Sequence, residues 1–148
     1  MLAYQPVSSL MSTHLVTVAP EDNLVKVRGI FDSHSFHHLP VVKDKEIVGL
    51  ISRTDFEHYY GAASSAVDDH LVNEMRLKRT LAEDIMTKRL GKVEPDDRIN
   101  VALEIFCMNR FHALPVVEGK ELVGIITPYD IMKAILDQKP NEAHLAYE

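Results

Sequence analysis

The chain has a single cysteine, Cys107, and no tryptophan among its 148 residues. One cysteine excludes a disulfide within the chain and fits a reducing compartment, so we expect a cytoplasmic protein. No apolar run approaches the roughly 20 residues that span a bilayer, and residues 1–10 lack the basic start and apolar core of a signal peptide. These absences predict a protein without a membrane segment.

Positive charge is also scarce, because 16 lysines and arginines stand against 22 aspartates and glutamates, for a formal net charge of −6. A nucleic-acid surface needs clustered cations, so this balance argues against one. The only loose basic stretch consists of Arg76, Lys78, Arg79, Lys88 and Arg89. We interpret it as cations at the end of a helix, where they complement the helix dipole, with an RNA contact as the weaker alternative.

The residue pattern gives no support for catalysis or metal binding. No serine or cysteine lies at a recognisable spacing from a base, and no glycine-rich loop is suited to cradle a phosphate. Cys107 lies among apolar neighbours in a predicted helix, where we expect a buried small hydrophobic residue. The densest histidine group, at 34–38, has no acidic partner at metal-ligand spacing. The sequence therefore predicts neither an enzyme nor a metal site.

What the sequence does contain is an internal repeat. Shifted by 75 positions, residues 10–56 align with residues 85–131 without a gap, and 19 of the 47 aligned positions are identical. Each copy has a Leu-Pro-Val-Val block followed by a run of the form Gly-apolar-apolar-Ser/Thr-x-x-Asp. A unit this small buries little apolar surface alone, so we expect the two copies to share a core.

Both copies predict the same order of elements, βαββα, so the fold class is α+β with two such repeats packed as a pseudo-twofold pair. The first copy has a short strand at 17–18, a helix at 22–34, strands at 39–42 and 47–51, and a helix ending near 61. The second has a short strand at 92–93, a helix at 97–109, strands at 114–117 and 122–126, and a helix at 127–138. The predicted segments are repeat 1 (1–62), a helical connector (63–80), repeat 2 (81–138) and a C-terminal tail (139–148).

Two apolar stripes suggest how the helices pack. In the connector, a helical stripe predicts a packed helix, and it consists of Ala66, Val67, His70, Leu71 and Met75. In the second copy, Val101, Ile105 and Met108 form a strip outside the core-facing side of the helix, where the first copy has Lys26, Ile30 and Ser33. We expect that strip to pack at an interface, either between the copies or across a homodimer.

The repeat and its two motifs together resemble the CBS domain, named after cystathionine β-synthase. The tandem arrangement over residues 7–137 is similar to a CBS pair, or Bateman module. The resemblance implies one module with two clefts that bind adenosine-containing ligands, and modules that pair into flat dimers. Most members regulate an attached enzyme, channel or transporter, whereas this chain resembles a stand-alone sensor.

The resemblance also implies which residues meet a ligand. Asp55 and Asp130 would accept hydrogen bonds from neighbouring ribose hydroxyls, and Ser52 and Thr127 would contact ribose or phosphate. Close approach of the backbone would be permitted by Gly49 and Gly124. The backbone wall of the purine would come from Thr17, Val18, Lys92 and Val93. The phosphate would meet His37, His38, His112 and Arg53. Pro128 replaces Arg53 in the second copy, so the two clefts are not equivalent.

Both motifs have an interpretation without a ligand. A hydroxyl residue three positions before a carboxylate is the spacing of a helix capping box, which would explain both Ser/Thr-x-x-Asp runs. The histidines before the Leu-Pro blocks would then be exposed loop residues.

The favoured function is regulatory binding of AMP, ADP or ATP, with NAD or S-adenosylmethionine as weaker alternatives, without a required cofactor and with an unknown regulated protein. The rival is a ligand-free interaction scaffold.

Overall fold

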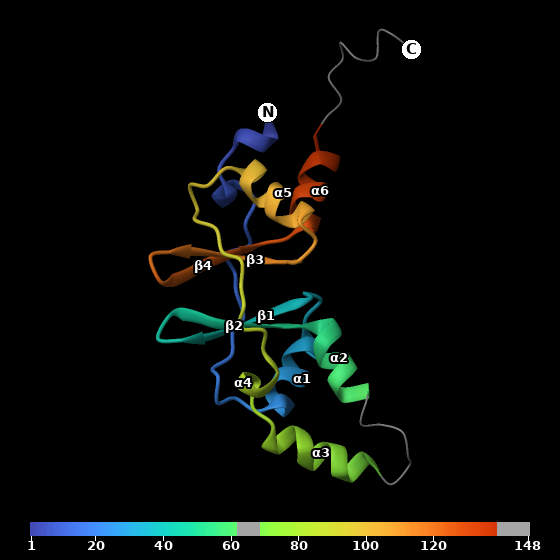
Figure 1. The fold of residues 1–148 in the computed structure, drawn as a ribbon. Helices are drawn as coiled ribbons and strands as arrows, with labels where there is room; N and C mark the ends of the chain where they lie inside the picture. The colour runs from blue at the N-terminus through green and yellow to red at the C-terminus, as the bar shows by residue number, and fades with distance from the viewer. Residues whose placement is uncertain (62–68, 139–148) are drawn as a thin grey trace, which may run out of the picture. The chain divides into compact units, whose positions relative to one another are not determined.

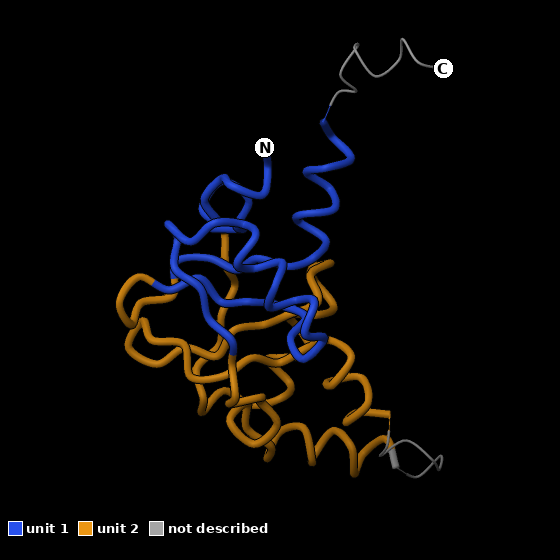
Figure 2. The backbone as a smooth tube through the Cα atoms, turned by 45° about the horizontal axis from the view of Figure 1, so that its top comes forward, with its two compact units in different colours: residues 1–13, 91–117, 123–148 blue, residues 14–90, 118–122 orange. Residues whose placement is uncertain are grey.

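The computed structural model describes residues 1–61 and 69–138, which fall into two compact units (Figures 1 and 2). Unit 1 takes in residues 1–13, 91–117 and the chain from 123 onward, and unit 2 takes in residues 14–90 and 118–122. The fold is α+β, as predicted, with two repeats of the same element order. Among the described residues, no helix is both long and apolar enough to cross a membrane.

Unit 2 contains the helices and hairpin of the first repeat and the connector helix. Its elements are α1 (Leu24–Ser33), β1 (His38–Lys43), β2 (Glu46–Ser52), α2 (Arg53–Gly61), α3 (Asp69–Arg79) and α4 (Ala82–Ile85). Asn23 starts α1, because its side chain accepts a hydrogen bond from the Lys26 backbone N–H at 3.1 Å. The antiparallel hairpin turns at Asp44 and Lys45, both with positive φ angles. The hairpin and the helices α1 and α2 therefore form where the sequence predicts them.

The core of unit 2 lies between the hairpin and α1 and α2. From α1 it takes Leu24, Val27 and Phe31, which pack against β1 and β2. The rings of Phe31 and Phe56 lie 5.7 Å apart between their centroids, which joins α1 to α2. Because all of these side chains are nearly inaccessible to solvent, they fix the start of α2 relative to the end of β2.

The connector helix α3 packs through a different face from the predicted one. His70, Leu71 and Met75 are exposed, and Ala66 and Val67 lie outside the described residues. The inward side of α3 instead carries Asn73 and Leu77, which are 8% and 2% exposed, and Leu77 belongs to the core that α1 and α2 also form. The predicted stripe was wrong because the Arg28–Glu74 ion pair and the hydrogen bond from Arg76 to the Tyr59 hydroxyl decide which side of α3 faces inward.

Unit 1 contains the corresponding elements of the second repeat and the start of the chain. They are η1 (Leu2–Tyr4), η2 (Val7–Ser9), α5 (Ile99–Cys107), β3 (Leu114–Glu118), β4 (Glu121–Ile126) and α6 (Pro128–Leu136). Residues 118–122, where β3 turns into β4, belong to unit 2, and Glu121 there pairs with Glu46 of β2. Cys107 is exposed, so the expectation of a buried cysteine was wrong: α5 ends there and no element covers it in the described chain.

Each repeat sends its leading segment into the unit built mainly from the other repeat. In unit 1, Val7 is fully buried, and its N–H donates to the Asp97 carbonyl at 2.7 Å. In unit 2, Ala82 is fully buried, and its N–H donates to the Asp22 carbonyl at 2.7 Å. The compact units therefore do not coincide with the sequence repeats.

Candidate functional site

In each unit, the predicted purine wall is a single extended residue beside the first hairpin strand. The Val18 N–H donates to the Pro40 carbonyl at 3.0 Å, and the Val42 N–H donates to the Val18 carbonyl at 2.8 Å. Val18 therefore turns both of its backbone polar groups toward β1. Thr17, one residue earlier, is exposed, and its backbone N–H and carbonyl make no hydrogen bond within the described chain.

Unit 1 repeats this arrangement beside β3. The Val93 N–H donates to the Pro115 carbonyl at 3.0 Å, and the Val117 N–H donates to the Val93 carbonyl at 2.9 Å. Lys92 is exposed, and its backbone groups have no partner among the residues that the structure describes. Each unit thus leaves the backbone polar groups of one residue, Thr17 or Lys92, free to pair with a flat polar ligand such as a purine.

The Asp55 carboxylate is open at the start of α2. The Ser52 hydroxyl oxygen accepts a hydrogen bond from the Asp55 N–H at 3.0 Å, so the hydroxyl caps the helix. The carboxylate itself does not turn back to Ser52. It is exposed, and it makes no hydrogen bond or ion pair with any described residue. Its oxygens are therefore available to ribose hydroxyls.

The Asp130 carboxylate is already engaged at the start of α6. One of its oxygens, Oδ2, accepts hydrogen bonds from the Thr127 N–H at 2.9 Å and the Thr127 hydroxyl at 3.1 Å. The Asp130 N–H lies 3.4 Å from the same hydroxyl oxygen, which completes a capping box around Pro128. The capping interpretation thus holds for both residues of the motif in the second repeat, Thr127 and Asp130. In the first repeat it holds for Ser52 alone, because the Asp55 carboxylate does not cap the helix.

The Arg53 side chain donates hydrogen bonds to backbone carbonyls in residues 34–36. Its Nε donates to the Phe36 carbonyl at 3.1 Å, and its Nη2 donates to the carbonyls of Phe36 at 2.9 Å and His34 at 2.6 Å. The guanidinium also lies over the Phe31 ring, 5.0 Å from its centroid. The backbone N–H of Arg53 also donates to the His37 carbonyl at 2.7 Å, so Arg53 holds residues 34–37 against the start of α2.

The predicted phosphate histidines lie just before the hairpin strands. His37 and His112 are exposed, and His38 begins β1 opposite Ser52. His34 is not free, because its Nδ1 lies 2.9 Å from the Ile30 carbonyl oxygen. The described chain holds no group of three or more histidine, cysteine, aspartate or glutamate side chains arranged for a metal ion.

The two predicted glycines make room for methionines from the leading segments. A β-carbon at Gly49 would lie 2.2 Å from the Met86 sulfur, and one at Gly124 would lie 2.6 Å from the Met11 sulfur. Both glycines are therefore required for packing inside their units, and contact with a ligand stays a prediction. The sequence held a signal for this pairing, since Met11 and Met86 are identical residues 75 positions apart.

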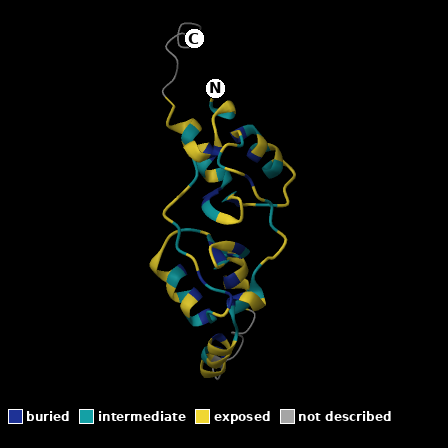
Figure 3. Ribbon diagram, turned by 90° about the vertical axis from the view of Figure 1, so that its left-hand side faces the viewer, coloured by how far each residue is buried: buried dark blue, intermediate teal, exposed yellow. Residues whose placement is uncertain are grey.

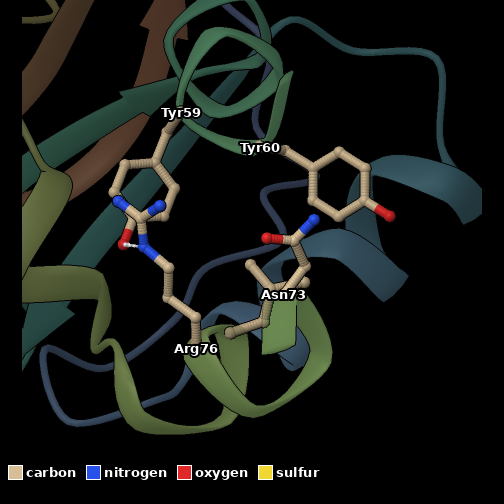
Figure 4. Close-up of a pocket in the computed structure, with 5 residues that line it drawn as sticks. Tyr59, Tyr60, Asn73 and Arg76 are labelled. Carbon is tan, nitrogen blue, oxygen red and sulfur yellow. Dashed lines mark hydrogen bonds between the residues drawn. The ribbon is translucent and has the colours of Figure 1, made fainter. Parts of the chain in front are cut away.

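A shallow groove between α2 and α3 is a joint between helices (Figure 4). The Arg76 guanidinium lies over the Tyr59 ring at 4.4 Å, and its Nε donates to the Tyr59 hydroxyl at 2.9 Å. Arg28 of α1 forms a two-pronged ion pair with Glu74 of α3, which lowers the pKa of the Glu74 carboxyl. These contacts hold α3 against α1 and α2, so Arg76 belongs to this joint.

Comparison with known proteins places the chain in one family. A family model described as CBS domain matches residues 7–61 and 82–137. Inosine-5′-monophosphate dehydrogenase of Korarchaeum cryptofilum is 29% identical over 130 residues, which cover 87% of this chain and 24% of that protein. The chain thus spans about a quarter of the length of that relative.

Solved structures share the fold. CBSX2, a CBS-pair protein from Arabidopsis thaliana, was solved in complex with AMP; it has a TM-score of 0.75 and 22% identity and covers 92% of this chain and 99% of its own. The CBS domain pair of protein MJ0100, solved with 5′-methylthioadenosine and S-adenosyl-L-methionine, has a TM-score of 0.71 and 20% identity, and covers 92% of this chain and 99% of its own.

Proposed function

Because the chain belongs to the CBS-domain family and carries the family's repeat twice, we propose that it is a regulatory, non-enzymatic module that binds AMP, ADP or ATP. The observation that carries the proposal is the open Asp55 carboxylate, which follows the end of β2 while the free backbone edge of Thr17 flanks the neighbouring strand β1. A carboxylate for the ribose and a polar backbone edge for the base are the two contacts that an adenosine requires. The AMP and S-adenosylmethionine complexes of proteins with this fold support an adenosine ligand.

In the proposed function, the two repeats make different contacts with the ligand. Asp55, Ser52, Thr17 and Val18 form the primary half-site, with His37 and His38 directed to a phosphate. In the second repeat, the contacts would come from the second carboxylate oxygen of Asp130, the backbone groups of Lys92 and the side chain of His112. Thr127 and Val93 would position them, because Thr127 bonds to Asp130 and the backbone of Val93 pairs with β3. For Arg53, the hydrogen bonds to the carbonyls of His34 and Phe36 favour positioning of the histidine segment over direct phosphate contact.

The proposed output is a change in the surface that the module presents to a regulated protein. A bound nucleotide can shift the module between arrangements only if it binds one of them more tightly. The module would act as a homodimer. A ligand-free scaffold is the second candidate, and the closed capping box at Asp130 favours it for that repeat.

Thermal unfolding with a panel of ligands separates the two candidates. The panel contains AMP, ADP, ATP, NAD and S-adenosylmethionine, with guanosine monophosphate as the control for the base and adenosine as the control for the phosphate. We expect selective stabilisation by an adenine nucleotide, about 2.7 kcal/mol at a concentration 100-fold above its Kd. No shift with any member of the panel would favour the scaffold, and an equal shift with guanosine monophosphate would contradict recognition of adenine.

A further inference from the structure

One polar side chain in the joint between α2 and α3 is buried without a partner. Asn73 is 8% exposed, and its side-chain amide makes no hydrogen bond within the described chain. Figure 4 shows this amide at the groove, between Tyr60 and Arg76. A buried amide without partners costs stability that an apolar side chain of similar size would not cost. A partner from outside unit 2 would give the amide the hydrogen bonds that it lacks.

Arg76, on the next turn of α3, has donors that the joint leaves free. Its Nε donates to the Tyr59 hydroxyl at 2.9 Å, whereas Nη1 and Nη2 make no hydrogen bond or ion pair in the part of the chain that the structure describes. The guanidinium lies 4.4 Å from the centroid of the Tyr59 ring, so the tyrosine holds it in place. A guanidinium fixed in this way presents two parallel N–H groups, which is the arrangement that binds a carboxylate through two hydrogen bonds.

The outward side of α3 is apolar and exposed. Leu71, Val72 and Met75 are 72%, 60% and 46% exposed, and Figure 3 shows α3, at the foot of the view, mostly in the colour of exposed residues. Leu71 and Met75 are four residues apart, as are Val72 and Arg76, so each pair lies side by side on the helix. Applied to ordinary residue areas, the three fractions leave roughly 300 Å² uncovered, at the low end of the largest apolar patch on a typical monomer. Each partner of a standard interface buries about 800 Å², so this area suits a short segment better than a folded domain.

The free charge beside these apolar residues is positive. Arg79 is exposed and forms no ion pair within the described chain, and Arg76 bonds only to Tyr59. Glu74 of the same helix is paired with Arg28, so it does not neutralise them. Because the whole chain has a formal net charge of −6, this is a local excess of cations, and its complement is an anionic partner.

We propose that these residues form a docking surface for a segment of the regulated protein in which acidic side chains lie beside apolar ones. The surface, called here the α3 surface, consists of Leu71, Val72, Asn73, Met75, Arg76 and Arg79. The two arginines bind carboxylates of the segment, the Asn73 amide bonds to one of its backbone peptide groups, and the three apolar residues cover its apolar side chains. The proposal rests on the proposed function and deepens it, because it gives the chemistry of the partner that a regulatory module requires.

One helix joins the α3 surface to the proposed nucleotide half-site. Asp55 lies in the first turn of α2, and Tyr59, which holds Arg76, lies on the next turn. A segment bound to the α3 surface therefore contacts a guanidinium positioned by the helix that also carries Asp55. A shift of α2 on nucleotide binding would move Tyr59, and with it the guanidinium that the segment binds.

An RNA strand is the other anionic partner that the cations suit, and the apolar residues argue against it. Lysine and arginine alone neutralise phosphates, so Leu71, Val72 and Met75 would stay exposed beside a phosphate backbone. The formal net charge of −6 also opposes long-range attraction of a polyanion. A protein segment accounts for the cations and the apolar residues together.

The test selects binding sequences from random peptides displayed on phage, of about twelve residues, the scale of segments that dock in grooves. The library is first depleted on the Met75→Glu variant of the whole chain and then selected on the wild type, so the surviving sequences require the α3 surface. We expect enriched peptides with aspartate or glutamate beside aliphatic or aromatic residues. Met132→Glu, the same change at an exposed methionine of α6, is the matched control and should bind these peptides as the wild type does.

Two further variants test single contacts with a synthetic peptide of the most enriched sequence. Asn73→Leu removes the amide with little change in volume, and we expect it to weaken peptide binding about tenfold. It should also keep or raise the midpoint of urea unfolding, because the amide has no partner to lose. Arg79→Glu should weaken binding of the same peptide about tenfold. If Asn73 were only structural, Asn73→Leu would lower the urea midpoint and leave peptide binding unchanged.

Each result decides the proposal. No enrichment, enrichment of basic peptides, or peptide binding that survives both Asn73→Leu and Arg79→Glu overturns it. Binding of a labelled oligouridylate that Arg79→Glu lowers and Met75→Glu does not would overturn it in favour of RNA. A dimer in sedimentation that only Met75→Glu dissociates would assign the surface to a second copy and overturn it as well.

The nucleotide panel separates these failures from a failure of the proposed function. No residue of the α3 surface belongs to the proposed half-site of Asp55, so Met75→Glu should keep the stabilisation by an adenine nucleotide. Loss of peptide binding with that stabilisation retained concerns the docking surface alone. Circular dichroism of each variant confirms that it is folded.

Discussion

At the scale of single residues, two aspartates at equivalent positions of the repeat do different work. The Asp55 carboxylate has no partner in the described chain, whereas Asp130 closes a capping box with Thr127. We expect Asp55→Asn to weaken AMP binding tenfold to a hundredfold, about the 1.5–3 kcal/mol of a charge-assisted hydrogen bond, with little effect on stability. Asp130→Asn should lower the free energy of unfolding by about 1 kcal/mol, through the loss of its cap.

Calorimetric titration with AMP and urea unfolding of both variants measure the two effects side by side. Each variant is the control for the other, because both remove one charge at the third position of a helix. A loss of stability in Asp55→Asn equal to that in Asp130→Asn, together with unchanged AMP binding, would contradict the division of roles.

The sequence predicted the pattern of these residues but could not predict that Asp55 and Asp130 have different roles. The spacing of hydroxyl and carboxylate residues fits capping and ligand binding equally, and the two runs differ at Arg53 and Pro128. Arg53 has an N–H that bonds to the His37 carbonyl, and proline has none. That contact joins residues far enough apart in sequence that only the folded hairpin brings them together.

At the scale of elements, Arg53 acts as a clamp between α2 and the segment at 34–36. Its three side-chain hydrogen bonds need the planar guanidinium, which lysine cannot reproduce. We therefore expect Arg53→Lys and Arg53→Gln to speed hydrogen exchange of the amides at 35–38 by a similar factor, about tenfold. Both variants should also weaken AMP binding to a similar extent.

Direct contact with a phosphate gives a different result. The charge would then matter more than the shape, so Arg53→Lys would bind AMP nearly as wild type while Arg53→Gln would not. Arg79→Gln, a change at an exposed arginine on α3, is the control for a general loss of positive charge. Exchange measured without nucleotide tests the clamp even if AMP does not bind.

Most elements could be predicted from periodicity, because the hairpins and the first helix of each repeat have strong apolar patterns. The face of α3 could not, since the partners of Glu74 and Arg76 are Arg28 and Tyr59 on other helices. Cys107 was misjudged for a related reason, because a run of apolar residues does not show where a helix ends. Periodicity describes one element, and these outcomes depend on what lies beside it.

At the scale of the whole molecule, each repeat packs its leading segment into the unit built mainly from the other repeat. The stability of each unit therefore depends on residues of both repeats. Alignment of the repeats shows that the segments at 7–11 and 82–86 are equivalent, but not which unit each one completes. Only the contact of Met11 with Gly124, and of Met86 with Gly49, answers that question. The position of a segment in the sequence was therefore a poor guide to the core it enters.

This exchange makes a prediction about local stability. Val7 precedes the first repeat but is fully buried in unit 1, so Val7→Ala should destabilise unit 1 by about 2 kcal/mol. Hydrogen exchange should then rise in α5 and β4 while β2 stays protected. Val27→Ala, at an equally buried valine in unit 2, is the matched control and should loosen α1 and β2 instead. If Val7→Ala loosened the β1–β2 hairpin first, the leading segment would belong to the repeat that it precedes, and the two units would have to be redrawn along the boundaries of the sequence repeats.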